Sequence, residues 1–206
     1  MKIALRPAAV LAAAGLLVLA VGASAATPAA LTLTDAKGDG NGVNDAGTGS
    51  GLEGAPGPGS RDGVDVVSLT LANTVVGKGK KASCNGFTAT LGLSGPPEGN
   101  TLYRVDGTGV VNAGRFWLKY NNNPVSGTTT TLQIESAAVS TLDLAPAKVA
   151  GNKITFIVTA KDIKASGEKP GFTYSTPSVD VRGSSGAVFA PVWDQLLNDS
   201  KSFKTC

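Results

Sequence analysis

The sequence predicts an all-β fold, an antiparallel β-sandwich of about eight to ten strands with a short C-terminal helical turn. Apolar and polar residues alternate with a period of two in short runs between residues 64 and 181, which is typical of half-buried strands. These runs are rich in β-branched and aromatic residues, which fit the pleated surface of a sheet. Clusters of Gly, Pro, Asn and Ser separate the runs, as expected of turns between strands.

The first 25 residues have the pattern of a cleavable export signal. Lys2 and Arg6 provide a charged start, an uncharged apolar run follows over residues 8–21, and Ala23-Ser24-Ala25 offers the small residues that a signal peptidase accepts. The apolar run is shorter than the roughly 20 residues of a transmembrane helix. We therefore expect a secreted, extracellular protein whose mature chain, residues 26–206, has no transmembrane segment and forms a single domain.

A first short strand is predicted over residues 31–34, and a long stretch of different composition follows it. From residue 35 to residue 63 the chain is rich in Gly, Asp, Asn, Pro and Ser and has little to bury. Connections of this length inside a compact domain are usually functional or disordered. We expect this loop to have one of these two characters.

Further runs predict the rest of the sandwich. They cover residues 65–72, 87–93, 102–105, 115–120, 129–140, 141–149, 153–160 and 172–181. In the clearest run, Ile154, Phe156 and Val158 fall on one face and should point into the core. The same rule directs these side chains inward: Val67, Leu69, Leu71, Phe87, Ala89, Leu91, Leu93, Phe116, Leu118 and Tyr120.

Two segments are expected to differ from the strands. The run Lys78-Gly79-Lys80-Lys81 lies between two predicted strands, and a solvated hairpin tip explains it more simply than a phosphate contact. Residues 191–198 predict the helical turn, because apolar residues recur there at helical spacing, namely Val192 with Leu196 and Trp193 with Leu197.

The composition argues against several classes of function. The formal net charge is +3, and loss of Lys2 and Arg6 leaves the mature chain near +1, without the clustered basic face of a nucleic-acid-binding protein. The chain has no histidine, which removes Ser-His-Asp and Cys-His catalysis and histidine-bound zinc. We therefore expect no nucleic-acid partner and no enzymatic activity. A hydrolase that uses carboxylates alone, with Glu135 and Asp143 as candidates, stays open.

Two cysteines, Cys84 and Cys206, are present in the mature chain. An even number of cysteines in an exported protein favours a disulfide, which here would tie the last residue of the sequence to the start of an internal strand. Two free thiols, or pairing between two chains, are the alternatives.

Acidic and amide side chains are concentrated in the 35–63 loop and just after it. The candidate calcium ligands are Asp35, Asp39, Asn41, Asp45, Asp62 and Asp65. Calcium takes six to eight oxygen ligands, and the surrounding glycines would let the loop fold tightly around the ion. The spacing does not fit an EF-hand, since Lys37 and Ala46 fall where that loop needs oxygen ligands. The alternative is a flexible, solvated loop in which Asp and Asn simply form turns.

Several short motifs carry a resemblance to a known family. Leu31-Thr32-Leu33-Thr34-Asp35, then Gly38-Asp39-Gly40, and after the gap Asp65-Val66-Val67-Ser68-Leu69 resemble exported bacterial β-sandwich domains of the DOMON-like class, which are similar to the family 9 carbohydrate-binding modules. The strand Lys153–Val158 followed by Asp162-Ile163 looks like a late strand and turn of the same class. The resemblance spans most of the mature chain.

This resemblance implies a sandwich, often with a structural calcium near the first strand, and in some members sugar or haem binding. Carried over by position, Asp35, Asp39 and Asp65 are the implied metal ligands. Haem ligands are missing, because there is no histidine and the one methionine is Met1. Trp117 is the best candidate for a sugar platform, since Arg115 and Lys119 beside it indicate a solvent-facing side; burial under a loop or in a second layer is the alternative.

Together these observations predict a secreted non-catalytic binding module, stabilised by calcium and binding carbohydrate. The alternative is a structural or protein-interaction domain of the cell envelope with no small ligand. The expected partner is accordingly a polysaccharide or a component of the cell envelope.

Overall fold

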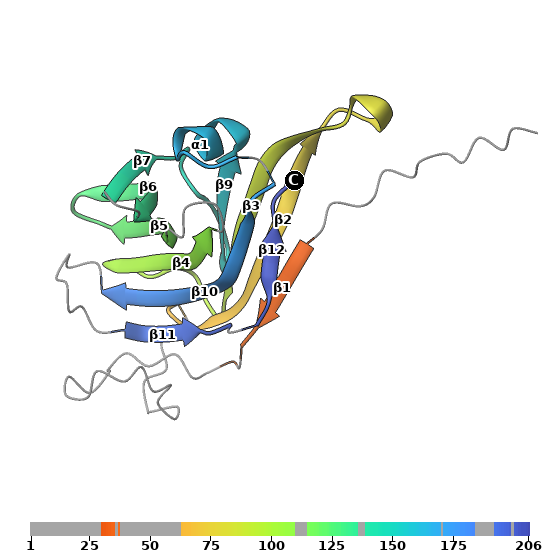
Figure 1. The fold of residues 1–206 in the computed structure, drawn as a ribbon. Coiled ribbons are helices and arrows are strands. Elements are labelled where there is room, and N and C mark those ends of the chain that lie inside the picture. The colour runs from red at the N-terminus through yellow and green to blue at the C-terminus, as the bar shows by residue number, and fades with distance from the viewer. Residues whose placement is uncertain are drawn as a thin grey trace, which may run out of the picture.

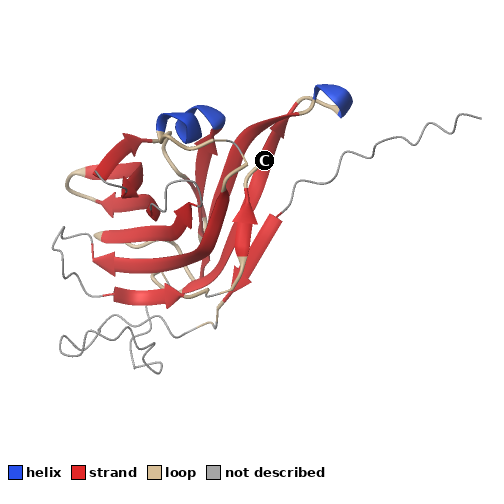
Figure 2. Cartoon of the chain, in the orientation of Figure 1, coloured by secondary structure: helices blue, strands red, loops and turns tan. Residues whose placement is uncertain are grey.

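The computed structural model describes residues 30–35, 37, 63–109, 115–135, 139–169, 171–183, 192–198 and 200–206. Within these ranges the chain forms twelve strands in two antiparallel sheets and one short α-helix, which confirms the predicted all-β sandwich (Figures 1 and 2). The predicted export signal and most of the 35–63 loop lie outside the described residues.

The first sheet has five strands in the order β1-β2-β3-β9-β8. These strands are β1 (Ala30–Thr34), β2 (Val66–Val76), β3 (Ser83–Leu93), β9 (Lys153–Thr159) and β8 (Lys148–Ala150). The long β2–β3 hairpin forms the centre of the sheet, and β9 returns from late in the sequence to pair with β3.

The second sheet has the strand order β11-β10-β4-β5-β6-β7. Its strands are β11 (Val192–Leu196), β10 (Thr173–Gly183), β4 (Thr101–Gly109), β5 (Arg115–Asn123), β6 (Gly127–Glu135) and β7 (Val139–Asp143). A final short strand, β12 (Ser202–Lys204), pairs with the beginning of β10. The predicted strands over 129–140 and 141–149 are therefore divided differently, into β6, β7 and β8.

The core lies between the two sheets and follows the predicted alternation. The buried side chains include Leu69, Leu71, Phe87, Ala89, Leu91, Leu93, Phe116, Leu118, Tyr120, Ile154, Phe156 and Val158. The prediction for Val67 is wrong: a bulge pairs Val66 with Leu93 and Ser68 with Gly92. This extra residue leaves Val67 only half-buried and turns Val66 inward, because a bulge reverses the alternation on one side of it.

The helical turn predicted for residues 191–198 is a strand instead. Val192–Leu196 forms β11 and pairs with β10. Asp194 and Leu196 are buried whereas Leu197 is exposed, which is the period-two pattern. The run is too short for its spacing to separate helix from strand, and the unpaired edge of β10 satisfies its backbone groups.

The α-helix of the structure lies elsewhere, at α1 (Ala160–Ala165) directly after β9. Thr159 caps it: its hydroxyl accepts from the Asp162 N–H, and the Asp162 carboxylate accepts from the Thr159 N–H. This reciprocal arrangement is a capping box. The Thr-x-x-Asp spacing at positions 159–162 was the available sequence signal for this helix.

The β2–β3 hairpin extends beyond the rest of the first sheet as an arm (Figure 1). Its tip is the 3-10 turn η1 (Gly79–Lys81), so the lysine-rich run does form a hairpin tip. Val75 and Val76, at the end of β2, are 41% and 49% exposed.

The predicted disulfide is confirmed. Cys84 in β3 is bonded to Cys206, with the two Cα atoms 5.5 Å apart. The C-terminal residue therefore lies against the base of the arm. The part of the chain that the structure describes contains no helix that is both long and apolar enough to cross a membrane.

Candidate functional site

The outer face of the second sheet carries a group of charged side chains around one tryptophan. Because Phe116 and Leu118 point into the core, Arg115, Trp117 and Lys119 point outward from β5. The strand register places Trp117 opposite Asp106 of β4 on one side and opposite Gln133 of β6 on the other. Trp117 is half-buried at the centre of this face.

Three cationic side chains surround the indole of Trp117. The guanidinium carbons of Arg104 and Arg115 lie 5.3 Å and 5.7 Å from the ring centroid, and Lys119 Nζ lies 5.1 Å from it. These distances are within the range of cation–π attraction. We call Arg104, Arg115, Trp117 and Lys119 the basic-aromatic cluster.

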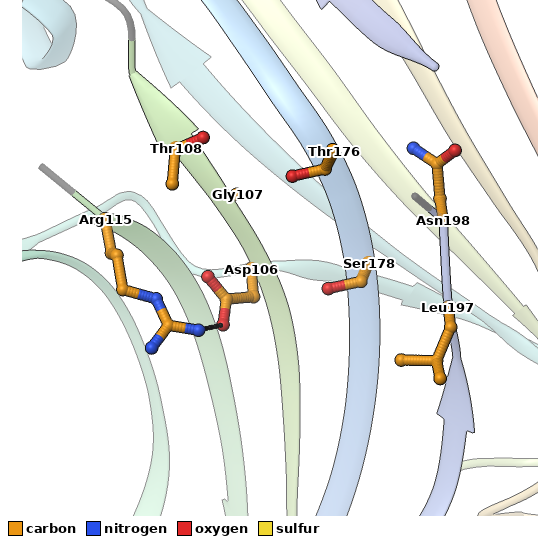
Figure 3. Close-up of a pocket in the computed structure, with 8 residues that line it drawn as sticks. All are labelled: Asp106, Gly107, Thr108, Arg115, Thr176, Ser178, Leu197 and Asn198. Atoms are coloured by element: carbon orange, nitrogen blue, oxygen red, sulfur yellow. Dashed lines mark hydrogen bonds and ion pairs between the residues drawn. The ribbon is translucent and has the colours of Figure 1, made fainter. Parts of the chain in front are cut away.

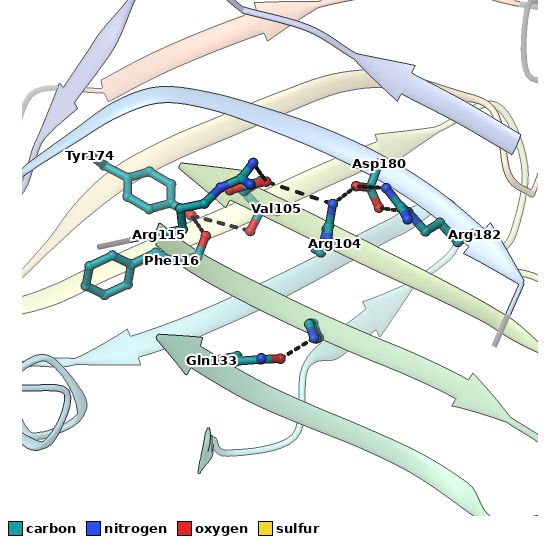
Figure 4. Close-up of polar contacts among 10 residues, drawn as sticks. Arg104, Val105, Arg115, Phe116, Gln133, Tyr174, Asp180 and Arg182 are labelled. Carbon is teal, nitrogen blue, oxygen red and sulfur yellow. Dashed lines mark hydrogen bonds and ion pairs between the residues drawn. The ribbon is translucent and has the colours of Figure 1, made fainter. Parts of the chain in front are cut away.

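Two aspartates neutralise part of this positive charge (Figure 4). Asp106 accepts a hydrogen bond of 3.0 Å from Arg115 Nη2, and Arg104 Nη2 lies 3.9 Å from the same oxygen. Asp180 accepts from Arg104 and also from two nitrogens of Arg182, at 3.1 Å and 3.2 Å. Two carboxylates are therefore shared among three arginines.

Lys119 lies opposite Arg104 in the ladder and is not an ion-pair partner of either aspartate in the described contacts. Its ammonium donates to the neutral amide oxygen of Gln133. Partial burial, and then the charge of Arg104, lower the pKa of Lys119 below its ordinary value. Keeping the Lys119 ammonium protonated therefore costs free energy in the folded state.

Some polar atoms of this face have no hydrogen-bond partner among the described residues although they are buried. They are Nε of Arg104, Nε1 of Trp117 and Oδ1 of Asn121. Buried polar atoms without partners are rare in folded proteins, and water or an ion is a common explanation for them. This face therefore has hydrogen-bonding capacity that the described protein groups do not use.

A pocket of about 280 Å³ lies at the end of the same face (Figure 3). Asp106 and Arg115 join it to the basic-aromatic cluster, and the hydroxyls of Thr176 and Ser178 point into the space between β10 and β4. Its size is near the lower end of small-molecule sites. The whole lining consists of Asp106, Gly107, Thr108, Arg115, Thr176, Ser178, Leu197 and Asn198.

A bulge in β10 creates this pocket. Ser175 pairs with Thr108 and Ser178 pairs with Asp106, so two residues of β10 face only Gly107 of β4. Thr176, within this bulge, has φ of +43°, a left-handed conformation that is a genuine outlier for a β-branched residue. Such backbone strain is concentrated at functional sites.

Gly107 forms the base of the pocket for a packing reason. A Cβ atom at this position would lie 2.9 Å from the ring of Tyr174, which is completely buried beneath it. Burial, and then the charge of Asp106, raise the pKa of Tyr174 well above its ordinary value. Its hydroxyl therefore stays protonated and uncharged.

The structure describes two of the six predicted calcium ligands. Asp35 follows β1, and its N–H donates to the Val67 carbonyl at 3.0 Å. Asp65 precedes β2, is completely buried, and its carboxylate accepts from the Ser94 hydroxyl. The other four, Asp39, Asn41, Asp45 and Asp62, lie outside the described residues. Among the described side chains, no three His, Cys, Asp or Glu residues are grouped to hold a metal ion.

The carboxylate pair considered for hydrolysis lies on neighbouring strands. Glu135 pairs with Val139, whereas Asp143 pairs with Thr131 at the other end of the same ladder. Four residues of strand separate the two positions, about 13 Å. The carboxylates of glycoside hydrolases lie roughly 5–9.5 Å apart, so the backbone spacing does not favour this reaction.

No family model, no curated protein and no solved structure matches the chain.

Part of this site was predictable from the sequence, because Arg115, Trp117 and Lys119 alternate along one strand. Arg104 and Asp180, which come from β4 and β10, were not predicted, because the order of strands in a sheet cannot be read from alternation. The Arg-x-Asp spacing at 104–106 was a weak available signal for two outward-facing charges on one strand.

Proposed function

We propose that the mature chain is a secreted, non-catalytic binding module that takes a carbohydrate on the outer face of the second sheet, around Trp117. The observation that supports this most strongly is an indole at the centre of an outward sheet face with planar hydrogen-bonding side chains around it. The proposal also agrees with the resemblance to carbohydrate-binding modules.

The chemistry of sugars suits such a surface. A sugar ring presents C–H groups on its faces and hydroxyls around its edge, so an aromatic ring can cover the face while polar side chains bind the edge. Trp offers a large apolar surface with little conformational freedom to lose. Arg115, Gln133 and Asn121 supply donors and acceptors beside it, and the neighbouring pocket offers room for a side group.

The test is binding of the mature, oxidised chain to a panel of insoluble and soluble polysaccharides, followed by titration calorimetry. Trp117→Ala should weaken binding by about tenfold or more, as expected for a central aromatic contact. Val125→Ala is the matched control, because Val125 is 92% exposed in the β5–β6 turn, away from this face. The proposal would be wrong if Trp117→Ala bound with the same affinity as the native chain, or if the native chain bound no polysaccharide.

Calcium is proposed as a stabilising ligand of the 35–65 segment. The support is the density of carboxylates and amides in that segment and the position of Asp35 and Asp65 at the ends of the strands it connects. A ligand present at 100 times its Kd stabilises the folded state by about 2.7 kcal/mol. The melting temperature should therefore rise in calcium relative to a chelator, and Asp39→Asn should reduce the rise. A melting temperature that is the same in calcium and in chelator would rule out calcium as a stabilising ligand.

The alternative function is a structural or protein-interaction domain of the cell envelope. The exposed Val75 and Val76 on the arm favour it, since neighbouring apolar side chains on a protruding hairpin suit a protein contact. Cell fractionation separates the two functions. Loss of envelope retention in the double variant Val75→Thr with Val76→Thr, but not in Trp117→Ala, supports the alternative. Loss in Trp117→Ala, but not in the double variant, supports carbohydrate binding.

A further inference from the structure

We propose that the carbohydrate bound by the basic-aromatic cluster is an acidic polysaccharide, whose anionic groups are bound by Arg115, Lys119 and Arg104 while a sugar ring covers Trp117. This inference rests on the proposed function and adds the chemical class of its ligand. The shared chemistry is a negatively charged substituent on a sugar chain, whether a carboxylate, a sulfate or a phosphate ester.

The first support is the balance of charge on the three central strands of the face. The described side chains there include four cations, Arg104, Arg115, Lys119 and Arg182, and two carboxylates, Asp106 and Asp180. The described ion pairs connect both carboxylates to the three arginines, and the register places Glu135 of β6 opposite Arg115 and Asp143 of β7 opposite Thr131 on the same face. Lys119 is thus the cation that has a neutral acceptor in place of a carboxylate among the described contacts. A cation held in this way favours an anionic partner, which restores local neutrality.

The second support is the way in which Lys119 is held. Its ammonium has a neutral acceptor, Gln133, and a neighbouring cation, Arg104, opposite it. Burial, and then the charge of Arg104, lower the pKa of Lys119. An anion bound at this point would compensate both the burial and the repulsion, because opposite charge favours the protonated amine.

The third support is the position of the cations relative to the ring. Arg115 and Lys119 lie on either side of Trp117 along β5, and the Arg115 side chain is 56% exposed. A sugar chain that runs along β5 would meet a cation before and after the ring that covers the indole. Guanidinium groups bind carboxylates, sulfates and phosphates through paired hydrogen bonds.

A nucleic acid is the other polyanion that such a face suggests. It is disfavoured because the mature chain is nearly neutral overall, whereas nucleic-acid-binding proteins combine their aromatic contacts with an extended basic surface. A local excess of charge beside one aromatic ring fits a polymer in which charges and apolar ring faces alternate.

The experiment compares polymers that differ only in charge, using the oxidised mature chain at low and high salt. Polygalacturonate is matched with its fully methyl-esterified form, dextran sulfate with dextran, and a phosphomannan with unphosphorylated mannan; duplex DNA is the competing polyanion. We expect the charged member of at least one pair to bind about tenfold tighter than its neutral counterpart, with the advantage reduced by salt. The pair that shows the preference identifies the anionic group.

Variants connect this preference to the cluster. Lys119→Met should weaken binding to the charged polymer by about tenfold, the effect of one charge-assisted hydrogen bond, and Arg115→Gln should act in the same direction. Lys153→Met is the matched control, since Lys153 is an exposed lysine on β9 of the other sheet. Its binding should equal that of the native chain.

The two proposals fail differently. Equal binding to charged and neutral polymers that depends on Trp117 overturns the acidic ligand and leaves carbohydrate binding intact. Binding to none of the polymers overturns both. DNA binding as tight as that of the best polysaccharide overturns the assignment to an acidic polysaccharide, and so does a charge preference that Lys119→Met and Arg115→Gln leave unchanged.

Discussion

Removing the Cys84–Cys206 disulfide should destabilise the protein strongly without changing its native structure. The bond closes a segment with a sequence separation of 122 residues, which contains every described strand after the start of β3. The perturbation is Cys84→Ser with Cys206→Ser, or reduction of the native chain. Its effect is expected in the unfolded state, where the chain regains the freedom that the cross-link removes.

The magnitude follows from the length of the closed segment. On the chain-entropy model a loop of this size stabilises by about 5 kcal/mol at 25 °C. For a domain of this length, each 1 kcal/mol corresponds to roughly 2–4 °C in melting temperature. The variant should therefore melt about 10–20 °C below the oxidised chain.

The native position of the C-terminal tail should survive, because other contacts hold it. Phe203 is buried, the Thr205 N–H donates to the Phe172 carbonyl at 2.9 Å, and the Cys206 N–H donates to Asn73 Oδ1 at 3.0 Å. The near-ultraviolet circular dichroism of the variant should thus match that of the native chain at 10 °C.

The assay is urea unfolding followed by tryptophan fluorescence, for the oxidised chain, the reduced chain and the double serine variant. Reduced chain and variant should agree with each other. A loss below 1 kcal/mol, or a large loss accompanied by a changed native spectrum, would refute the argument that the cross-link acts through the unfolded chain.

Other predictions concern single positions. Burial raises the pKa of the Glu168 carboxyl, so its ionised form is disfavoured in the fold, and the stability it contributes is present at acid pH and lost as the pH rises through that pKa. Glu168→Gln should therefore melt higher than the native chain at pH 7, and this difference should shrink toward pH 4; a difference that grows in acid would contradict the assignment. The pKa of Lys119 is lowered, so its stabilising contribution appears only as the pH rises toward the ordinary lysine value, and Lys119→Met should raise the melting temperature at pH 7 while it weakens binding. Gly86 has φ of +111°, and a Cβ there would lie 2.0 Å from the Val158 carbonyl oxygen, so Gly86→Ala should cost about 1–3 kcal/mol from backbone strain alone in urea unfolding; an unchanged midpoint would show that the strands move apart freely.

Local alternation was sufficient to predict most of the sandwich. Phe116 and Leu118 point inward and Trp117 points outward because successive side chains of a strand lie on opposite faces, a rule that needs no knowledge of the neighbouring strands. The number of cysteines and the expected compartment favoured the disulfide, and the position of residues 78–81 between two predicted strands favoured the hairpin tip.

Where two local rules compete, the sequence was insufficient. Residues 192–196 satisfy both a helical and a strand pattern, and only the free edge of β10 decides for β11. The bulge beside Val67 and the bulge at Thr176 also depend on the partner strand, because an extra residue is defined only by what lies opposite it.

The sequence by itself determined that this chain is a β protein, favoured the disulfide between Cys84 and Cys206, and offered Trp117 as a candidate for an outward face. Only the tertiary structure decided that Arg104 and Asp180, from strands far apart in the sequence, lie beside Arg115 and Lys119. The physical reason is that side-chain direction is a local property of a strand, whereas the order and register of strands depend on long-range pairing.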